Sequence, residues 1–96
     1  MTSNAVFRFR LFVAGDTPNS ARALAHLTAL CKAYLPARHE IEVVDVFREP
    51  ARALAEGIYM TPTLVKLAPG AVQRIVGTLS NQSTVLLALG LEAELS

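Results

Sequence analysis

Cysteine is almost absent from this sequence, which contains a single one, Cys31. One thiol cannot form a disulfide within the chain, so nothing in the sequence indicates an oxidising compartment. Lysine and arginine are also few, nine in all, and they are scattered among eight acidic residues rather than gathered in a block. Because nucleic-acid phosphates require a concentrated basic face, the sequence argues against a nucleic-acid partner.

Long hydrophobic runs are missing as well. Arginines interrupt the apolar part of the N-terminal segment "MTSNAVFRFRLFVAG", and no stretch has the length that a membrane-spanning helix needs. We therefore expect no signal peptide and no membrane partner, and we expect a cytoplasmic protein. The 96 residues are nevertheless 52% hydrophobic, which is enough for one packed core. The sequence predicts a single domain over residues 1–96.

Four apolar runs have the composition of strands. Residues 6–13 alternate phenylalanine with arginine before "LFV", and residues 41–46 read "IEVVDV". Two more runs, "TPTLVKLA" and "VQRIVGTL", are separated by Pro69 and Gly70, which favour a hairpin between them.

The longest predicted helix lies between the first two of these runs. Thr17 is predicted to cap it and Pro18 to occupy its first turn, and apolar residues then recur at helical spacing as far as Pro36. The residues expected on its buried side are Leu24, Leu27, Leu30, Cys31, Tyr34 and Leu35.

Two shorter helices complete the prediction. One fits between Pro50 and Gly57, and the last begins after Ser80 as its cap and ends at Leu89. The residues expected on the buried side of the last helix are Val85, Leu86 and Leu89. The order β-α-β-α-β-β-α, with the first two strands parallel, predicts an α/β, thioredoxin-like fold with a mixed sheet covered by helices.

A threonine and a proline at the start of the third strand also fit this fold. Proteins of the thioredoxin type commonly have a cis-proline there, close to the start of the first helix. The sequence leaves the isomer of the Thr61–Pro62 bond open.

The segment "AGDTPNS", residues 14–20, stands where a thioredoxin-type enzyme carries its reactive cysteines, yet it contains none. We interpret Cys31, farther along the apolar stripe, as a small buried hydrophobe. His26 and His39 have no Cys, Asp or Glu spacing around them that would complete a metal site, and hydrolase, P-loop and dinucleotide motifs do not occur. The sequence thus predicts no catalytic residue, no cofactor and no metal.

Four polar residues within or beside apolar runs are candidates for binding a partner: Arg22, Lys66, Arg74 and Asp45. Basic residues in such places are either solvated side chains or part of a docking surface for another protein. For Asp45, inside a strand, the alternatives are an ion pair with an arginine at a strand end and a role in binding.

Four segments in order resemble the KaiB family of bacterial circadian clock proteins: "LFVAGDTPNSARAL", "VVDVFREPARA", "TPTLVKLAPG" and "QRIVGTLSNQSTVLLALGL". The resemblance extends from about Val6 to Leu91. It implies a non-enzymatic protein that binds the ring ATPase KaiC and, in clock systems, helps to sequester KaiA and displaces a sensor kinase. It also implies that the matching positions Arg22, Lys66 and Arg74, together with Asp45, contribute to a KaiC-binding surface.

The resemblance further implies two folded states. Members of the family are metamorphic, since they rest as a tetramer whose C-terminal half is packed differently and switch to a thioredoxin-like monomer that binds KaiC. The sequence leaves open whether this protein forms a dimer or a tetramer. Because it has "APGAV" where members often have a run of prolines, and Ala88 where they often have glycine, our hypothesis is that it favours the thioredoxin-like form.

Glu40 and Glu42 stand on the strand that faces KaiA in the family, where basic residues are usual. This reversal of charge argues against KaiA binding and indicates a KaiB homologue of a simpler timing or stress-response system. Two alternatives stay open. One is the sensor domain of a histidine kinase, which would need a kinase segment after "LEAELS". The other is a cysteine-less thioredoxin-fold protein that binds a ligand such as glutathione, with Ser20 at the start of the first helix.

Overall fold

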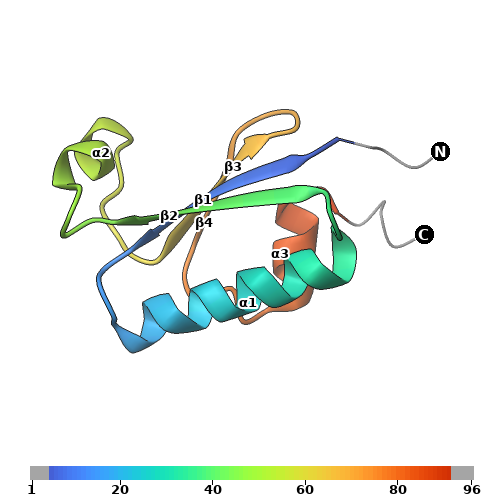
Figure 1. The fold of residues 1–96 in the computed structure, drawn as a ribbon, viewed down its shortest axis with the longest axis horizontal. Helices are drawn as coiled ribbons and strands as arrows, with labels where there is room; N and C mark the ends of the chain where they lie inside the picture. The colour runs from blue at the N-terminus through green and yellow to red at the C-terminus, as the bar shows by residue number, and fades with distance from the viewer. Residues whose placement is uncertain (1–4, 92–96) are drawn as a thin grey trace.

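The elements follow one another in the predicted order (Figure 1). The computed structural model describes residues 5–91 and contains β1 (Phe7–Val13), α1 (Pro18–Tyr34), β2 (His39–Asp45), α2 (Pro50–Ala55), β3 (Thr63–Ala68), β4 (Gln73–Val76) and α3 (Gln82–Ala88). The β-α-β-α-β-β-α order is confirmed, and each predicted element is present within a few residues of its expected bounds.

The four strands form one mixed sheet in the order β2-β1-β3-β4. β1 pairs in parallel with β2 and antiparallel with β3, and β3 pairs antiparallel with β4. Parallel neighbours cannot be joined by a tight turn, so the 17-residue α1 makes the connection between β1 and β2. The ends of β1, β2 and β4 and the start of β3 therefore lie together at one end of the sheet, here called the α2 end because α2 lies beside it (Figure 1).

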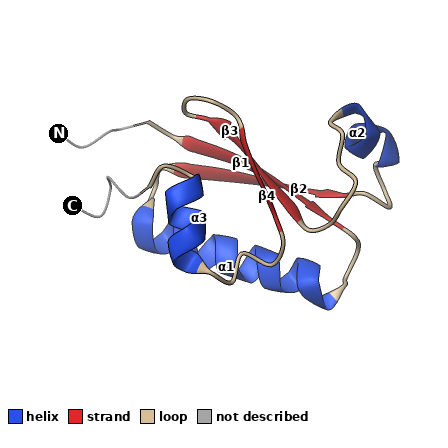
Figure 2. Cartoon of the chain, turned by 180° about the vertical axis from the view of Figure 1, so that it is seen from behind, coloured by secondary structure: helices blue, strands red, loops and turns tan. Residues whose placement is uncertain are grey.

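The two faces of the sheet are covered unequally (Figures 1 and 2). α1 and α3 pack on one face, and α2 reaches only one end of the other. Because side chains alternate along a strand, β1 contributes Phe7, Phe9 and Leu11 to the core under α1 and α3 and Phe12 to the core on the α2 side. The α2-side core is the smaller one; its buried members are Phe12, Val44, Ala53, Ile58 and Val65.

The start of α3 differs from the prediction. Its cap is Asn81 rather than Ser80, because the Asn81 side-chain oxygen accepts a hydrogen bond from the Thr84 backbone N–H at 3.2 Å. A short polar side chain one residue later thus satisfies an N–H group that has no partner inside the helix. The buried side of α3 is as predicted, with Val85, Leu86 and Leu89 in the core.

The buried stripe of α1 is rotated relative to the prediction. Leu24 is 36% exposed, and the fully buried Ala23 takes its place beside Leu27 and Cys31. Thr17 occupies the cap position, but its hydroxyl donates to Ser20 Oγ at 2.8 Å and caps no backbone N–H. The helix start was therefore predicted at the right residue with the wrong hydrogen bond.

The hairpin between β3 and β4 is confirmed, but β4 is shorter than the run "VQRIVGTL". It ends at Val76 because the backbone then turns through Gly77 and Leu79, both with positive φ (120° and 62°). The bonds Thr61–Pro62 and Ala68–Pro69 are both cis, which supplies the isomer that the sequence had left open.

Candidate partner-binding surfaces

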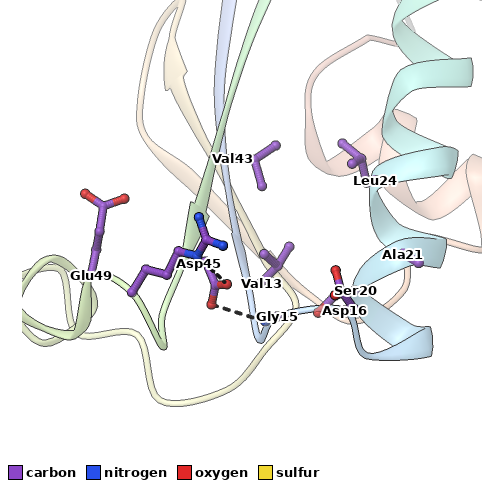
Figure 3. A pocket seen from close by; sticks show the side chains of 10 residues that line it. Val13, Gly15, Asp16, Ser20, Ala21, Leu24, Val43, Asp45 and Glu49 are labelled. Carbon is purple, nitrogen blue, oxygen red and sulfur yellow. Dashed lines mark hydrogen bonds and ion pairs between the residues drawn. The ribbon is translucent and has the colours of Figure 1, made fainter.

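A groove opens at the α2 end of the sheet, between the start of α1 and the end of β2 (Figure 3). Its volume is about 510 Å3. Leu24 from α1 and Val43 from β2 face each other across it, and both are partly exposed. The other residues that line it are Val13, Gly15, Asp16, Ser20, Ala21, Asp45, Arg48 and Glu49. A thioredoxin-type redox enzyme carries its reactive thiols at this position, and none of the described residues that line the groove contains sulfur.

Ser20 is the hydroxyl nearest to that position, and its oxygen is already engaged. It is buried and accepts hydrogen bonds from Thr17 Oγ1 at 2.8 Å and from the Ala14 backbone N–H at 3.1 Å. Its partners are thus a hydroxyl and an amide, neither of which can act as a general base toward it. The geometry therefore assigns Ser20 the role of joining the end of β1 to the start of α1.

The one thiol is inaccessible. Cys31 lies on the core side of α1, fully buried, and burial raises the pKa of its thiol to about 11 because a thiolate would lose its hydration there. A thiol in this state is a poor nucleophile at neutral pH. The interpretation of Cys31 as a small buried hydrophobe is confirmed.

The two histidines bind backbone carbonyls. His26 Nδ1 lies 2.6 Å from the Thr78 carbonyl oxygen and His39 Nδ1 lies 2.7 Å from that of Leu35. A carbonyl oxygen only accepts, so each Nδ1 carries the proton and donates. Within residues 5–91 no three His, Cys, Asp or Glu side chains are placed to hold a metal ion together.

Asp45 fastens the ends of β1 and β2. Its Oδ1 accepts from the backbone N–H groups of Gly15 at 3.2 Å and Phe47 at 2.9 Å, and its Oδ2 lies 4.0 Å from Arg48 Nε. Of the two alternatives left open for Asp45, the structure shows the ion pair at a strand end, with two backbone hydrogen bonds in addition. Through these contacts Asp45 holds one wall of the groove.

Lys66 is buried and hydrogen-bonded within the chain. It lies on β3 opposite Phe9 and Gln73, on the face that α1 and α3 cover. Its Nζ donates to the carbonyl oxygens of Pro69 and, at 3.0 Å, Ala71. The ammonium therefore closes the β3–β4 hairpin from inside.

Arg74 projects from the opposite face of the sheet. Arg74 lies on β4 directly opposite Val65 of β3, which is a member of the α2-side core, and the Arg74 side chain is exposed. Its guanidinium donates to the carbonyl oxygens of Glu56 and Gly57, just after α2. Arg74 thus connects β4 to the segment that leads from α2 into β3.

The Arg22 side chain is exposed on α1 and makes no hydrogen bond or ion pair with the described residues. The three predicted basic residues do not form one cluster, since Lys66 and Arg74 point to opposite faces of the sheet. Arg22 and Arg74 are available to a partner, whereas the Lys66 ammonium faces the hairpin.

Sequence reasoning missed an ion-pair network on the α2-side face. Arg10 Nε lies 2.7 Å from Glu42 and its Nη1 2.9 Å from Glu56, while Arg52 donates to both oxygens of Glu42. Hydrogen bonds from Arg52 and Arg10 lower the pKa of Glu42 to about 2. The sequence pattern that could have revealed this network is the recurrence of arginine at every second residue of β1 and of glutamate at every second residue of β2. Parallel pairing of the two strands places these arginines and glutamates side by side.

The acidic residues of β2 are consequently paired. Glu42 belongs to the network, and the Glu40 carboxylate lies 3.9 Å from Arg8 Nε. This face of the edge strand β2 therefore carries two glutamates whose charges are compensated by Arg8 and Arg10 of the neighbouring strand β1 and by Arg52 of α2.

The described helices include none that is long and apolar enough to cross a membrane.

Comparison with known proteins gives the family. Residues 10–91 match the family model described as the KaiB domain. The circadian clock protein KaiB3 of Synechocystis sp. is 39% identical over 85 residues, which is 88% of this chain and 83% of that protein. The circadian clock oscillator protein KaiB of Thermostichus vulcanus is 43% identical over 82 residues, which is 85% of this chain and 76% of that protein.

Solved structures give the fold. The N-terminal domain of Synechococcus elongatus SasA superposes with a TM-score of 0.73 at 22% identity, over 94% of this chain and 89% of that domain. Chloroplastic thioredoxin z superposes with a TM-score of 0.74 at 19% identity, over 92% of this chain and 80% of the other. The predicted thioredoxin-like fold is confirmed, and the chain belongs to the KaiB family of circadian clock proteins.

Proposed function

We propose that this protein is a non-enzymatic regulator that binds a KaiC-type ring ATPase in a circadian or simpler timing or stress-response system. The observation that carries the proposal is the KaiB family match over residues 10–91. The groove supports it, because Asp16, Thr17 and Pro18 stand where a redox enzyme of this fold needs a thiol, and Cys31 is buried. A scaffold of this kind is suited to recognition through its surface.

The four predicted site residues take two different roles in this proposal. We assign Arg22 and Arg74 direct contacts with the ATPase, because both side chains are exposed. Lys66 and Asp45 act by shaping the surface, since Lys66 holds the hairpin and Asp45 holds the ends of β1 and β2. Their replacement should weaken binding together with stability, whereas replacement of Arg22 should weaken binding alone.

We infer that a sensor kinase that docks on the same ATPase competes with this protein, and that KaiA is not a partner. The second inference is supported by the paired charges of β2, where Glu40 and Glu42 face arginines of the same chain. A partner that requires a basic edge would meet compensated charge there. The proposed site of action is the cytoplasm.

Size-exclusion chromatography with light scattering tests the proposal. The free protein is measured first, then its mixture with the KaiC homologue of the same genome in ATP and in ADP. Co-elution as a larger complex is the expected result, and its absence in both nucleotides would refute the function. A free protein of monomer mass is expected if the thioredoxin-like form is favoured, whereas a stable tetramer would contradict that hypothesis.

Two variants of α1 make the test specific. Arg22→Ala removes an exposed cation near the start of the helix, and Lys32→Ala removes one near its end. Neither side chain has a partner within the described residues, so both variants should keep the wild-type melting temperature. Weaker complex formation by Arg22→Ala but not by Lys32→Ala supports a contact at Arg22, and equal behaviour of the two variants contradicts it.

A further inference from the structure

Three large apolar side chains are exposed beside one another at the α2 end of β4. Tyr59 is 87% exposed, Met60 64% and Val76 56%. They line a single surface cavity of about 180 Å3 together with Gly57, Ile58, Thr63 and Arg74. Isolated exposed apolar residues are ordinary on protein surfaces, but a contiguous group around a hollow is typical of an interaction site. We name Tyr59, Met60, Val76 and Arg74 the β4 patch.

The backbone under the β4 patch is held in place by hydrogen bonds. The buried Ile58 donates its N–H to the Ala53 carbonyl at 2.9 Å, and Thr63 Oγ1 donates to the Met60 carbonyl at 2.6 Å. Arg74 binds the two carbonyls at the end of α2 from the other side. Because these hydrogen bonds constrain the loop backbone, a partner that docks here removes less backbone conformational entropy than it would on an unconstrained loop.

The charge of the β4 patch is positive. Arg74 is the one charged side chain among those that line the cavity. The nearby carboxylate of Glu56 is turned away from it, toward Arg10, at 2.9 and 3.0 Å. A guanidinium has five N–H groups, and Arg74 directs only part of them to the carbonyls of Glu56 and Gly57. The remaining donors suit a carboxylate.

β4 is also an edge strand, because β3 is its single neighbour in the sheet. An edge strand offers backbone N–H and C=O groups to an extended segment of another chain. Tyrosine, methionine and arginine are the residue types enriched at the centres of protein interfaces. The edge, the apolar cavity and the single positive charge therefore lie next to one another on one surface.

We propose that the β4 patch binds an extended segment of the KaiC-type ATPase that carries a large apolar side chain beside an aspartate or glutamate. The apolar side chain enters the cavity between Tyr59, Met60 and Val76, and the carboxylate pairs with Arg74. This inference rests on the proposed function and assigns the surface and the chemistry through which it operates.

The test compares two changes of exposed apolar side chains. The double variant Tyr59→Ala/Met60→Ala empties the β4 patch, and Leu87→Ala removes an apolar side chain that is 61% exposed on α3. Affinity for the KaiC homologue of the same genome is measured by biolayer interferometry in ATP and in ADP, and folding is checked by circular dichroism. Because truncation of a central interface residue commonly costs more than about 1 kcal/mol, the double variant should bind at least about tenfold more weakly. Leu87→Ala should bind within about twofold of the wild type.

Arg74→Gln separates the charge from the apolar contact. It should weaken binding and reduce the dependence of affinity on salt concentration, because one charge pair is lost. If the wild type binds the KaiC homologue and the double variant binds it with the same affinity, the inference is overturned and the proposed function stands. Absence of wild-type binding in both nucleotides would overturn both, and a loss as large in Leu87→Ala as in the double variant would place the contact elsewhere.

Discussion

Replacement of Lys66 by methionine tests whether this buried ammonium holds the β3–β4 hairpin. Lys66 is 5% exposed, and its Nζ donates to the carbonyls of Pro69 and Ala71. Methionine has a similar length and an apolar stem, so it keeps the packing beside Phe9 while it removes the donor. The variant therefore isolates the hydrogen bonds from the side-chain volume.

The expected loss follows from the two acceptors. A hydrogen bond from a charged group contributes about 1.5–3 kcal/mol, and two of them would contribute up to twice that amount. Two effects reduce the sum: Ala71 is exposed, so water can reach its carbonyl in the variant, and the cost of burying the ammonium disappears. We expect a net loss of about 1.5–3 kcal/mol, against a total stability of about 5–14 kcal/mol for a domain of this length.

Urea unfolding followed by circular dichroism measures this loss. With a slope of about 1.5 kcal/mol/M, the midpoint should fall by about 1–2 M. Lys32→Met on the exposed side of α1 serves as the matched control and should leave the midpoint unchanged. A shift below about 0.2 M for Lys66→Met would refute the reasoning. If the Lys66→Met variant kept its urea midpoint but lost ATPase binding, Lys66 would instead be a direct contact with the ATPase.

Three further predictions concern titration, reactivity and capping. The pKa of Glu42 lies near 2 in the folded protein, below its ordinary value of 4.5, so the Glu42 carboxylate stabilises the fold above about pH 4.5 and this stabilisation is lost as the pH falls toward 2. The variant Glu42→Gln should therefore lose less stability than the wild type over this pH range. The difference should be small because the Glu42 side chain is half exposed. The Cys31 thiol should not react with a thiol reagent at pH 8 until denaturant is added, and rapid reaction of the native protein would contradict its burial. Asn81→Ala should cost about 1 kcal/mol in urea unfolding and Ser80→Ala much less, whereas the reverse order would restore Ser80 as the cap.

Much of the fold follows from local patterns. The alternation in "FRFRLFV", the proline that opens each of the first two helices and the Pro69-Gly70 turn are short-range signals, and they predicted the elements and their order correctly. The exact face of α1 was less certain, because Ala23 and Leu24 are both apolar and adjacent. The neighbouring strands decide which of the two is buried.

The candidate site was predictable only in its residue types. The sequence identified Arg22, Lys66, Arg74 and Asp45 as polar residues in apolar surroundings, but it could not show that Lys66 and Arg74 point to opposite faces. It also gave little reason to single out "IYM", residues 58–60, since three consecutive apolar residues look like core. In the structure Ile58 is buried while the two that follow are exposed.

The sequence by itself determined the order of the elements, the absence of a thiol at the start of the first helix and the resemblance to the KaiB family, because these depend on residues that are close in the chain or on their identities. The tertiary structure decided which polar groups are already paired and which are free. Lys66 and Glu42 are engaged within the chain, whereas the Arg22 side chain and the apolar side chains of the β4 patch are open to a partner. That distinction depends on strand pairing between distant segments, and no local pattern of residues records it.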